Sequence, residues 1–287
     1  MRTKVEHWTE YRYSEEVSLS RHRLRLRPRN SEIQKVESFR FDFFPMPSLV
    51  RESIDSLGNH LTEVFIEQAH RFFQIKCVSQ VETVPRPFID PSLTPSWSQV
   101  ILDLQKMNQL DPRLYLYPSP YAPWVNGLHD WTEKSFPKEI PILVGVLDLS
   151  KRIFNDYTFD PQATTVSTPL SEVIKEKRGV CQDFAHLQVA ALRSMGIAAR
   201  YVSGYIRTAP QPGQMKLVGG DASHAWVSVF IPGSGWIDID PTNNRLVDEN
   251  YVVIGWGKDY SDVSLIRGTL TGGGSHSLSL SVDLSDL

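Results

Sequence analysis

A chain of 287 residues is long enough for about two compact domains, since typical domains hold ~100 to 200 residues. Hydrophobic residues at 41% and charged residues at 22% are ordinary for a soluble globular protein, which excludes a disordered or fibrous class. A formal net charge of -3 provides no basic surface for nucleic acid or an anionic membrane, so we expect neither as a partner.

The N-terminal segment and the cysteines also narrow the class of protein. Residues 1–7 lead into polar sequence without an apolar signal segment, and the apolar stretch at residues 140–147 is too short to span a bilayer. We therefore expect a cytoplasmic protein. Only two cysteines occur, Cys77 and Cys181, and the sequence has no paired Cys or His ligands at metal-site spacing. We predict no disulfide framework, no metal and no cofactor.

The first 85 residues alternate apolar and polar side chains, for example at residues 24–27, 39–43 and 73–77. This period of two is typical of half-buried strands, and residues that favour turns separate the segments. The pattern predicts an N-terminal antiparallel β-sandwich. Cys77 falls inside one of these strands, where a buried cysteine more often acts as a small hydrophobic residue than as a reactive group.

Residues 86–136 are rich in proline and aromatic residues and form a predicted connector, with a short helix near residues 98–107. Large aromatic side chains commonly serve packing, so they indicate no ligand site here. An apolar periodic stretch at residues 140–154 then predicts a helix, and Thr168-Pro169 predicts the start of another.

Near the C-terminus, residues 278–284 alternate strictly and follow three glycines, Gly272 to Gly274. They predict a final strand, which either closes the first sheet or extends the second. The predicted organisation is a β-rich domain at 1–85, a connector at 86–136, a catalytic core at 137–255 and a C-terminal segment at 256–287.

Residues 177–187 pass from a glycine-bearing loop into an apolar helix, which places Cys181 at the helix N-terminus. There, unpaired backbone N–H groups and the positive end of the helix dipole favour the thiolate, the reactive form of the side chain. A cysteine at a helix start is still more often structural than catalytic, so its partners must decide the question.

His224 begins a predicted strand, and a turn at residues 232–235 returns the chain to a second strand that ends at Asp240. A hairpin of this kind brings His224 and Asp240 to the same open end, where they could act as base and orienting acid for Cys181. Asp238 competes with Asp240, because the period of two places both on one face of the strand. The alternatives without catalysis are that His224 is an ordinary hydrogen-bonded histidine within a strand, and that Asp240 belongs to a turn that merely ends the second strand.

Three motifs, in this order, resemble those of the transglutaminase-like superfamily: Gly-Val-Cys-Gln-Asp-Phe-Ala at residues 179–185, His-Ala-Trp-Val at 224–227, and Gly-Trp through Asp-Pro-Thr at 235–242. Residues 13–28 and 55–59 are similar to the N-terminal region that accompanies this core in bacterial cysteine proteases of transglutaminase-like type. Residues 256–263 resemble their C-terminal motif.

The resemblance implies a catalytic triad with Cys181 as nucleophile, His224 as base and Asp240 as orienting acid. It also implies a core of α+β class, in which a helix bears the cysteine and an antiparallel sheet bears the histidine and aspartate. Ser228 and Lys258 depart from the family pattern, where glutamate and arginine are usual. Asp183 and His186 lie one turn beyond Cys181. They could support the triad, or they could simply be polar residues on the surface of the helix, and the sequence favours neither explanation.

A triad of this kind attacks an amide carbonyl and forms a thioester. Resolution by water gives hydrolysis of a peptide or side-chain amide, whereas resolution by an amine gives transamidation by a protein-glutamine acyltransferase. The resemblance favours a cysteine protease that acts on a peptide or protein substrate, and the segment at 207–222 is expected to shape the pocket. A non-catalytic peptide-binding scaffold is the alternative from another class.

Overall fold

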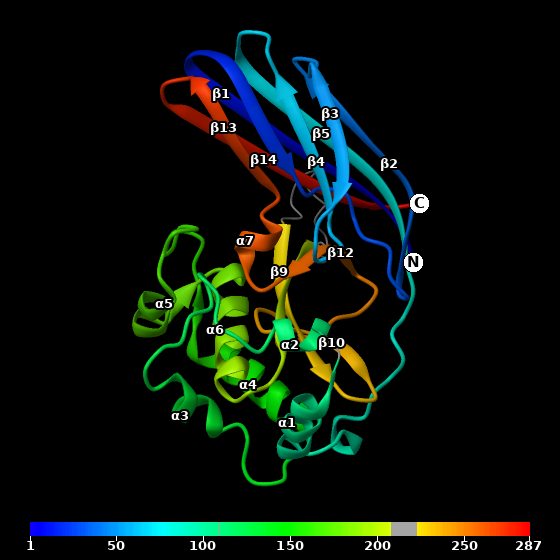
Figure 1. Cartoon of the computed structure of the whole chain (residues 1–287), viewed down its shortest axis with the longest axis vertical. Coiled ribbons are helices and arrows are strands. Elements are labelled where there is room, and N and C mark those ends of the chain that lie inside the picture. Colours follow the sequence, from blue (N-terminus) through cyan, green and yellow to red (C-terminus); the bar gives the residue numbers. More distant parts are fainter. Residues whose placement is uncertain (109, 208–222) are drawn as a thin grey trace, which may run out of the picture.

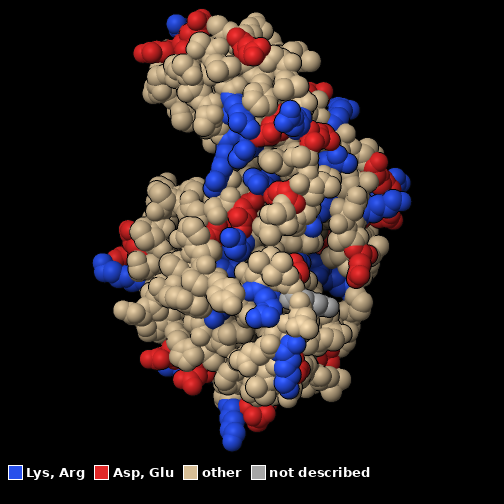
Figure 2. All heavy atoms as spheres, in the orientation of Figure 1, with Lys and Arg blue, Asp and Glu red and all other residues tan. Residues whose placement is uncertain are grey.

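The computed structural model describes residues 1–108, 110–207 and 223–287, in which an N-terminal antiparallel sheet lies at one end of a body of helices and strands (Figure 1). This is the α+β class predicted from the sequence. The surface is indented between these two parts, and Lys and Arg side chains gather beside the indentation (Figure 2). Among the described residues, no helix is both long enough and apolar enough to cross a membrane.

Within the described residues the N-terminal sheet has seven strands, and β1 (Arg2–Leu24) lies at its centre. At 23 residues, β1 is far longer than a typical strand of ~5–6 residues, so its two halves pair with different neighbours. Residues 2–12 of β1 pair with β5, and residues 20–24 pair with β4. The strands on this side of β1 are β2 (Gln34–Phe44), β3 (Leu49–Ile54), β4 (His60–Ile66) and β5 (His70–Thr83).

The final strand closes the first sheet. β13 (Ile266–Gly272) pairs antiparallel with β1 over residues 17–24, and β14 (His276–Asp286) continues along residues 3–13 of β1. β13 and β14 therefore form one interrupted strand beside β1. The antiparallel strands predicted for the N-terminal region thus form a single curled sheet that runs through both halves of β1.

The second sheet has five strands in the part of the chain that the structure describes, in the order β11-β10-β9-β8-β12. These strands are β8 (Ala199–Ile206), β9 (Ser223–Ile231), β10 (Gly235–Asp240), β11 (Arg245–Leu246) and β12 (Tyr251–Gly257). A short parallel pair, β6 (Thr158–Phe159) and β7 (Arg178–Gly179), lies outside both sheets. The helices are α1 (Trp97–Lys106), α2 (Leu110–Leu114), α3 (Leu128–Glu133), α4 (Ile142–Asp156), α5 (Leu170–Glu176), α6 (Cys181–Ser194) and α7 (Tyr260–Val263).

The central element of the body is α6, whose residues 183–193 are all buried. It packs against β8 and β9 on one side and against α3, α4 and α5 on the other. A helix enclosed in this way is apolar around most of its circumference, which agrees with its run of alanine, leucine and valine. The largest hydrophobic cluster of the protein surrounds it.

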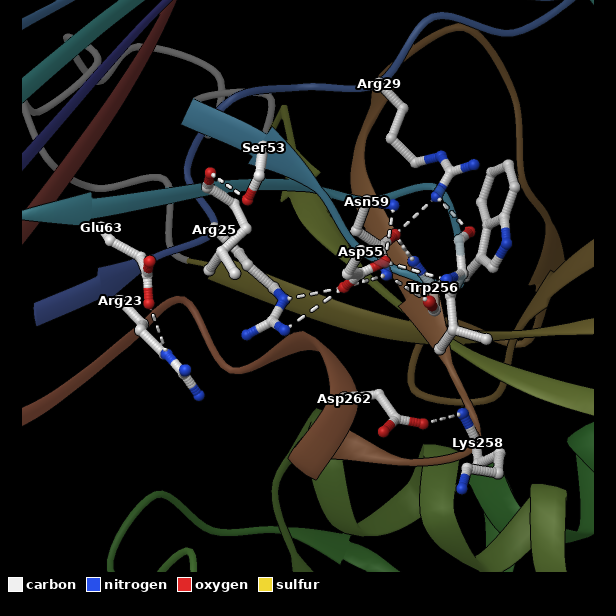
Figure 3. A network of polar contacts seen from close by, with 12 residues as sticks. Arg23, Arg25, Arg29, Ser53, Asp55, Asn59, Glu63, Trp256, Lys258 and Asp262 are labelled. Atoms are coloured by element: carbon white, nitrogen blue, oxygen red, sulfur yellow. Dashed lines mark hydrogen bonds and ion pairs between the residues drawn. The ribbon is translucent and has the colours of Figure 1, made fainter. Parts of the chain in front are cut away.

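Two side-chain amides join the N-terminal sheet to the edge strand β12, and Figure 3 shows that of Asn59 beside Trp256. The Asn59 amide donates to the Trp256 carbonyl at 2.9 Å and accepts from the Trp256 N–H at 3.0 Å. Gln34 makes the same two-bond contact with the main chain of Val253, at 2.8 and 2.7 Å. The Arg29 guanidinium lies 3.5 Å from the centre of the Trp256 ring. These contacts hold the two parts of the protein together along β12.

Candidate active site

Cys181 is the first residue of α6, and Asp183 fixes the turn that presents it. The Asp183 carboxylate accepts hydrogen bonds from the Val180 N–H at 2.8 Å and the Thr164 hydroxyl at 2.6 Å. A Cβ atom at Gly179 would lie 2.6 Å from this carboxylate, so the close approach requires glycine. The role of Asp183 is therefore to hold the turn that begins the helix.

The position of Cys181 suits a nucleophile. Its side chain is only partly buried, and it packs against the main hydrophobic cluster. The N–H groups of the first helical turn have no acceptor within the helix, and the dipole of α6 adds positive potential at this end. Both effects favour a thiolate and an anionic oxygen beside it. The structure thus places Cys181 where the sequence predicts it.

His224 and Asp240 meet at the open end of the β9–β10 hairpin. The strands are antiparallel, and Val227 on β9 lies opposite Ile239 on β10. The Nε2 atom of His224 lies 2.7 Å from the Oδ2 atom of Asp240. Cys181 lies near enough to His224 to contribute to the rise in its pKa. The three residues predicted from the sequence therefore form one contiguous group.

The charge state of His224 follows from its partners. Burial opposes protonation of the ring, but the hydrogen bonds and electrostatic attraction of Asp240 and Cys181 outweigh it and raise the pKa to about 10. The ring is therefore an imidazolium near neutral pH, and it lies next to both the thiol and the carboxylate. In general, an imidazolium beside a thiol stabilises the thiolate, which is the form in which a cysteine acts as a nucleophile.

Asp240 is fully buried and accepts five hydrogen bonds. Its Oδ2 atom accepts from His224, from the Asn243 amide at 2.6 Å and from the Tyr251 hydroxyl at 2.8 Å. Its Oδ1 atom accepts from the main-chain N–H groups of Thr242 and Asn243. Burial raises the pKa of Asp240, but the bonds and charge of His224, with those of Asn243 and Tyr251, lower it overall. The carboxylate is thus charged and held in one orientation.

Asn243 and Tyr251 are two residues of this site that the sequence does not single out. Asn243 follows Asp240 by three positions, and a local signal exists because an aspartate at a turn often accepts from nearby N–H groups. Tyr251 begins β12, eleven residues after Asp240, and no turn or strand pattern indicates its contact with Asp240.

Asp238 has different partners. Its Oδ2 atom accepts from the Arg86 guanidinium at 2.6 Å and from the Trp226 indole N–H at 3.2 Å. Trp226 is fully buried, and its ring packs 6.2 Å from the His224 ring, measured between centroids. Asp238 therefore binds the connector, through Arg86, and Trp226. Asp240 is the carboxylate that contacts His224.

His186 has a structural environment. Its ring stacks on Tyr121 and Tyr201 with centroid distances of 5.4 and 4.7 Å, and its Nε2 atom accepts from the Tyr260 N–H at 3.1 Å. Burial lowers the pKa of His186 to about 3, so the ring stays neutral. It thereby attaches α7 to α6. A cavity of about 200 Å³ lies beside these residues, and Tyr121, Gln182 and His186 are part of its lining.

The two departures from the family pattern lie outside the group of three. Lys258 contributes its main chain: its N–H donates to Asp262 at 2.8 Å, and its carbonyl accepts from the Arg193 guanidinium at 2.6 Å. Because both bonds use main-chain atoms, they do not require arginine at this position. Ser228 is fully buried on β9.

Part of the expected pocket lies outside the structure. Of the segment at 207–222 that is expected to shape it, residues 208–222 are outside the described residues. Over residues 1–108, 110–207 and 223–287, no group of three or more His, Cys, Asp and Glu side chains is arranged to hold a metal ion.

A buried helix that carries a cysteine at its N-terminus, packed on an antiparallel sheet that carries histidine and aspartate, defines a transglutaminase-like fold. The model of the transglutaminase-like superfamily matches residues 134–241, and that of the bacterial transglutaminase-like N-terminal region matches residues 3–82. The chain belongs to the transglutaminase-like superfamily, as the three motifs predict.

Several known proteins are similar to this chain over most of its length. An uncharacterized protein of Mycobacterium tuberculosis is 37% identical over 99% of this chain and 92% of its own length. An uncharacterized protein of Mycobacterium leprae is 33% identical over 100% of this chain and 99% of its own. The crystal structure of a candidate cysteine protease from Cytophaga hutchinsonii shares the fold with a TM-score of 0.79, at 22% identity, over 99% of this chain and 90% of that one.

A protein-glutamine gamma-glutamyltransferase of Pseudomonas aeruginosa is 28% identical over 152 residues, which are 51% of this chain and 22% of that protein. The similarity to this transferase is therefore partial. The two mycobacterial relatives, which match the chain over its whole length, carry no named activity.

Proposed function

We propose that the protein is a cysteine-nucleophile hydrolase that cleaves peptide or side-chain amide bonds through a thioester. The observation that carries this proposal is the position of His224, which bonds to Asp240 at 2.7 Å and lies near enough to Cys181 to interact with it. A structural role needs no such alignment of thiol, imidazole and buried carboxylate, whereas amide cleavage needs all three.

In the proposed reaction, the Cys181 thiolate attacks the amide carbonyl and a C–S bond forms. The carbonyl oxygen becomes an oxyanion, which accepts a hydrogen bond from the Cys181 main-chain N–H at the start of α6. The His224 imidazolium then gives its proton to the leaving nitrogen as the C–N bond breaks. Neutral His224 next takes a proton from water, which attacks the thioester and restores the thiolate with release of a carboxylic acid. Asp240 orients the ring throughout.

Amine transfer is the second candidate function. The partial similarity to the glutamyltransferase of Pseudomonas aeruginosa favours it, and the likeness to the candidate cysteine protease of Cytophaga hutchinsonii favours hydrolysis. The first half of the reaction is identical in both, because the two differ only in whether water or an amine reaches the thioester.

The experiment compares the wild type with Cys181→Ala on a library of labelled peptides. We expect cleavage by the wild type and none by Cys181→Ala. The matched control is Cys77→Ala, which removes the other cysteine from a buried strand and should leave the specific activity unchanged. Cleavage that survives Cys181→Ala would sink the proposed nucleophile.

Mass spectrometry of the products separates the two reactions. In the presence of a primary amine, hydrolysis gives shortened or deamidated peptides, whereas transfer gives peptides heavier by the added amine. If the amine adduct is the dominant product at modest amine concentration, the protein is a transferase and the hydrolase assignment is wrong.

A further inference from the structure

Exposed sheet edges are prone to pair with other chains, and proteins usually block them with charges, short strands or covering groups. The two outer strands of the N-terminal sheet on the far side of β1 carry such charges. β3 is six residues long and contains Arg51 and Glu52. The charged residues of β2 are Lys35, Glu37, Arg40 and Asp42.

Both edges of the second sheet are protected in other ways. β11 has two residues, which offer few main-chain groups to a partner. The main chain of β12 is occupied by the side-chain amides of Gln34 and Asn59, which bond to Val253 and Trp256. Each of these edges therefore has a recognisable obstacle to pairing.

The edge formed by β14 differs from the others. Among the described residues, residues 276–282 of β14 pair with β1 on one side and with no strand on the other. Residues 276–280 are all exposed, and Leu278 and Leu280 are exposed by 56% and 47%. From Gly268 to Val282 the sequence contains no lysine, arginine, aspartate, glutamate or proline. An uncharged strand with two exposed leucines favours association.

The order of residues in this strand selects the partner. Residues 277–281 read Ser-Leu-Ser-Leu-Ser, which is the same in both directions. If two copies pair antiparallel about a two-fold axis at Ser279, Leu278 of each copy lies opposite Leu280 of the other, and serines lie opposite serines. Both leucine pairs fall on one face of the sheet, because residues directly opposite in an antiparallel pair share a face. The strand is complementary to itself.

We propose that β14, over residues 276–282, pairs with the same strand of a second copy and forms a two-fold symmetric dimer with a sheet continuous across both chains. The proposal does not depend on the activity of the protein. A contact of about seven residues on each side is small beside the ~800 Å² per partner of a stable interface. We therefore expect an equilibrium between monomer and dimer in the micromolar concentration range rather than a permanent complex.

Ser279→Lys tests the pairing without damage to the monomer. Within one chain Ser279 lies opposite Glu10 on β1, so the introduced lysine faces an opposite charge. In the dimer the two introduced lysines face each other at the two-fold axis, and like charges oppose the pairing. The matched control is Ser53→Lys, which places the same charge on the exposed edge strand β3.

Sedimentation velocity over about two decades of micromolar concentration provides the measurement. We expect the mass of the wild type and of Ser53→Lys to rise from 32.7 kDa towards twice that value. Ser279→Lys should remain a monomer throughout. The proposal is overturned if the wild type stays monomeric, including the case in which it binds an extended peptide at β14 instead, or if Ser279→Lys associates as the wild type does.

Disulfide cross-linking tests the symmetry itself. In a Cys181→Ala background, Ser279→Cys places two thiols opposite each other at the axis, whereas Ser277→Cys places each thiol opposite Ser281 of the other copy. Mild oxidation should therefore cross-link Ser279→Cys into a dimer at least tenfold faster than Ser277→Cys. Equal rates would show that this register does not exist.

Discussion

The contact between His224 and Asp240 provides a direct test of the site through Asp240→Asn. This substitution keeps the shape of the side chain but removes the negative charge of the carboxylate, whose two oxygens accept five hydrogen bonds. Asparagine has one acceptor oxygen, and its amide nitrogen would face donors. The change should therefore both release His224 and lower the stability of the fold.

The magnitude follows from the pKa of His224, which is raised from 6.5 to about 10. That rise corresponds to roughly 5 kcal/mol in favour of the protonated ring, which Asp240 and Cys181 supply against the effect of burial. Without the carboxylate, we expect the pKa of His224 to fall below 7 and kcat/KM to fall by about 10³- to 10⁴-fold.

The assay is an NMR titration of the His224 ring, combined with kinetics on the substrate that the peptide library identifies. The matched control is Asp238→Asn, two residues away on the same strand, which contacts Arg86 and Trp226. It should lower stability by about 1–3 kcal/mol and leave the pKa of His224 high. If Asp238→Asn lowers this pKa and Asp240→Asn does not, the assignment of the carboxylate is wrong.

The raised pKa of His224 also predicts how the stability of the fold depends on pH. The folded-state pKa of His224 is higher than the unfolded value, so its contribution is fully present below pH 6.5 and is lost as the pH rises through 10. Urea unfolding of the wild type at pH 6 and pH 10 should show this loss, and Asp240→Asn should show less of it. Equal losses in both proteins would contradict the ion pair.

Three further outcomes are expected. Iodoacetamide should label Cys181 well before Cys77, because burial raises the pKa of the Cys77 thiol to about 12; labelling at equal rates would count against a reactive Cys181. Neither ring nitrogen of His22 has a hydrogen-bond partner among the described residues, and burial lowers its pKa to about 4. His22→Phe should therefore gain about 2 kcal/mol more stability at pH 5 than at pH 8 in urea unfolding, and a gain independent of pH would refute this. Tyr251→Phe removes the hydroxyl that donates to Asp240 at 2.8 Å and should lower kcat/KM about tenfold, so unchanged kinetics would exclude a positioning role for that bond.

Much of the site follows from short stretches of sequence. The glycine-bearing loop and the apolar helix after it place Cys181 at the start of α6, because helix starts depend on neighbouring residues. The turn at residues 232–235 and its flanking strands bring His224 and Asp240 to one end of a hairpin for the same reason. Local patterns likewise predict α1, α4 and α5 close to their observed positions.

The choice between Asp238 and Asp240 needed the tertiary structure, although the motif resemblance pointed to Asp240. Both lie on one face of β10, so the period of the strand treats them alike. They differ in what surrounds them: Arg86 comes from the connector to bind Asp238, while Tyr251 comes from β12 to bind Asp240. The Arg86 contact joins segments 152 residues apart, and the Tyr251 contact depends on how β12 is placed in the sheet, so the strand period indicates neither.

The sequence by itself determined the family, the cysteine at a helix start and the histidine on a hairpin, because these depend on residues close together in the chain. Only the tertiary structure decided that β14 closes the first sheet, since its partner β1 lies more than 250 residues earlier and either sheet could have accepted an alternating strand. The uncharged edge that β14 presents is a result of that placement. A strand pattern predicts which residues share a face, but the fold decides which of its edges remains exposed.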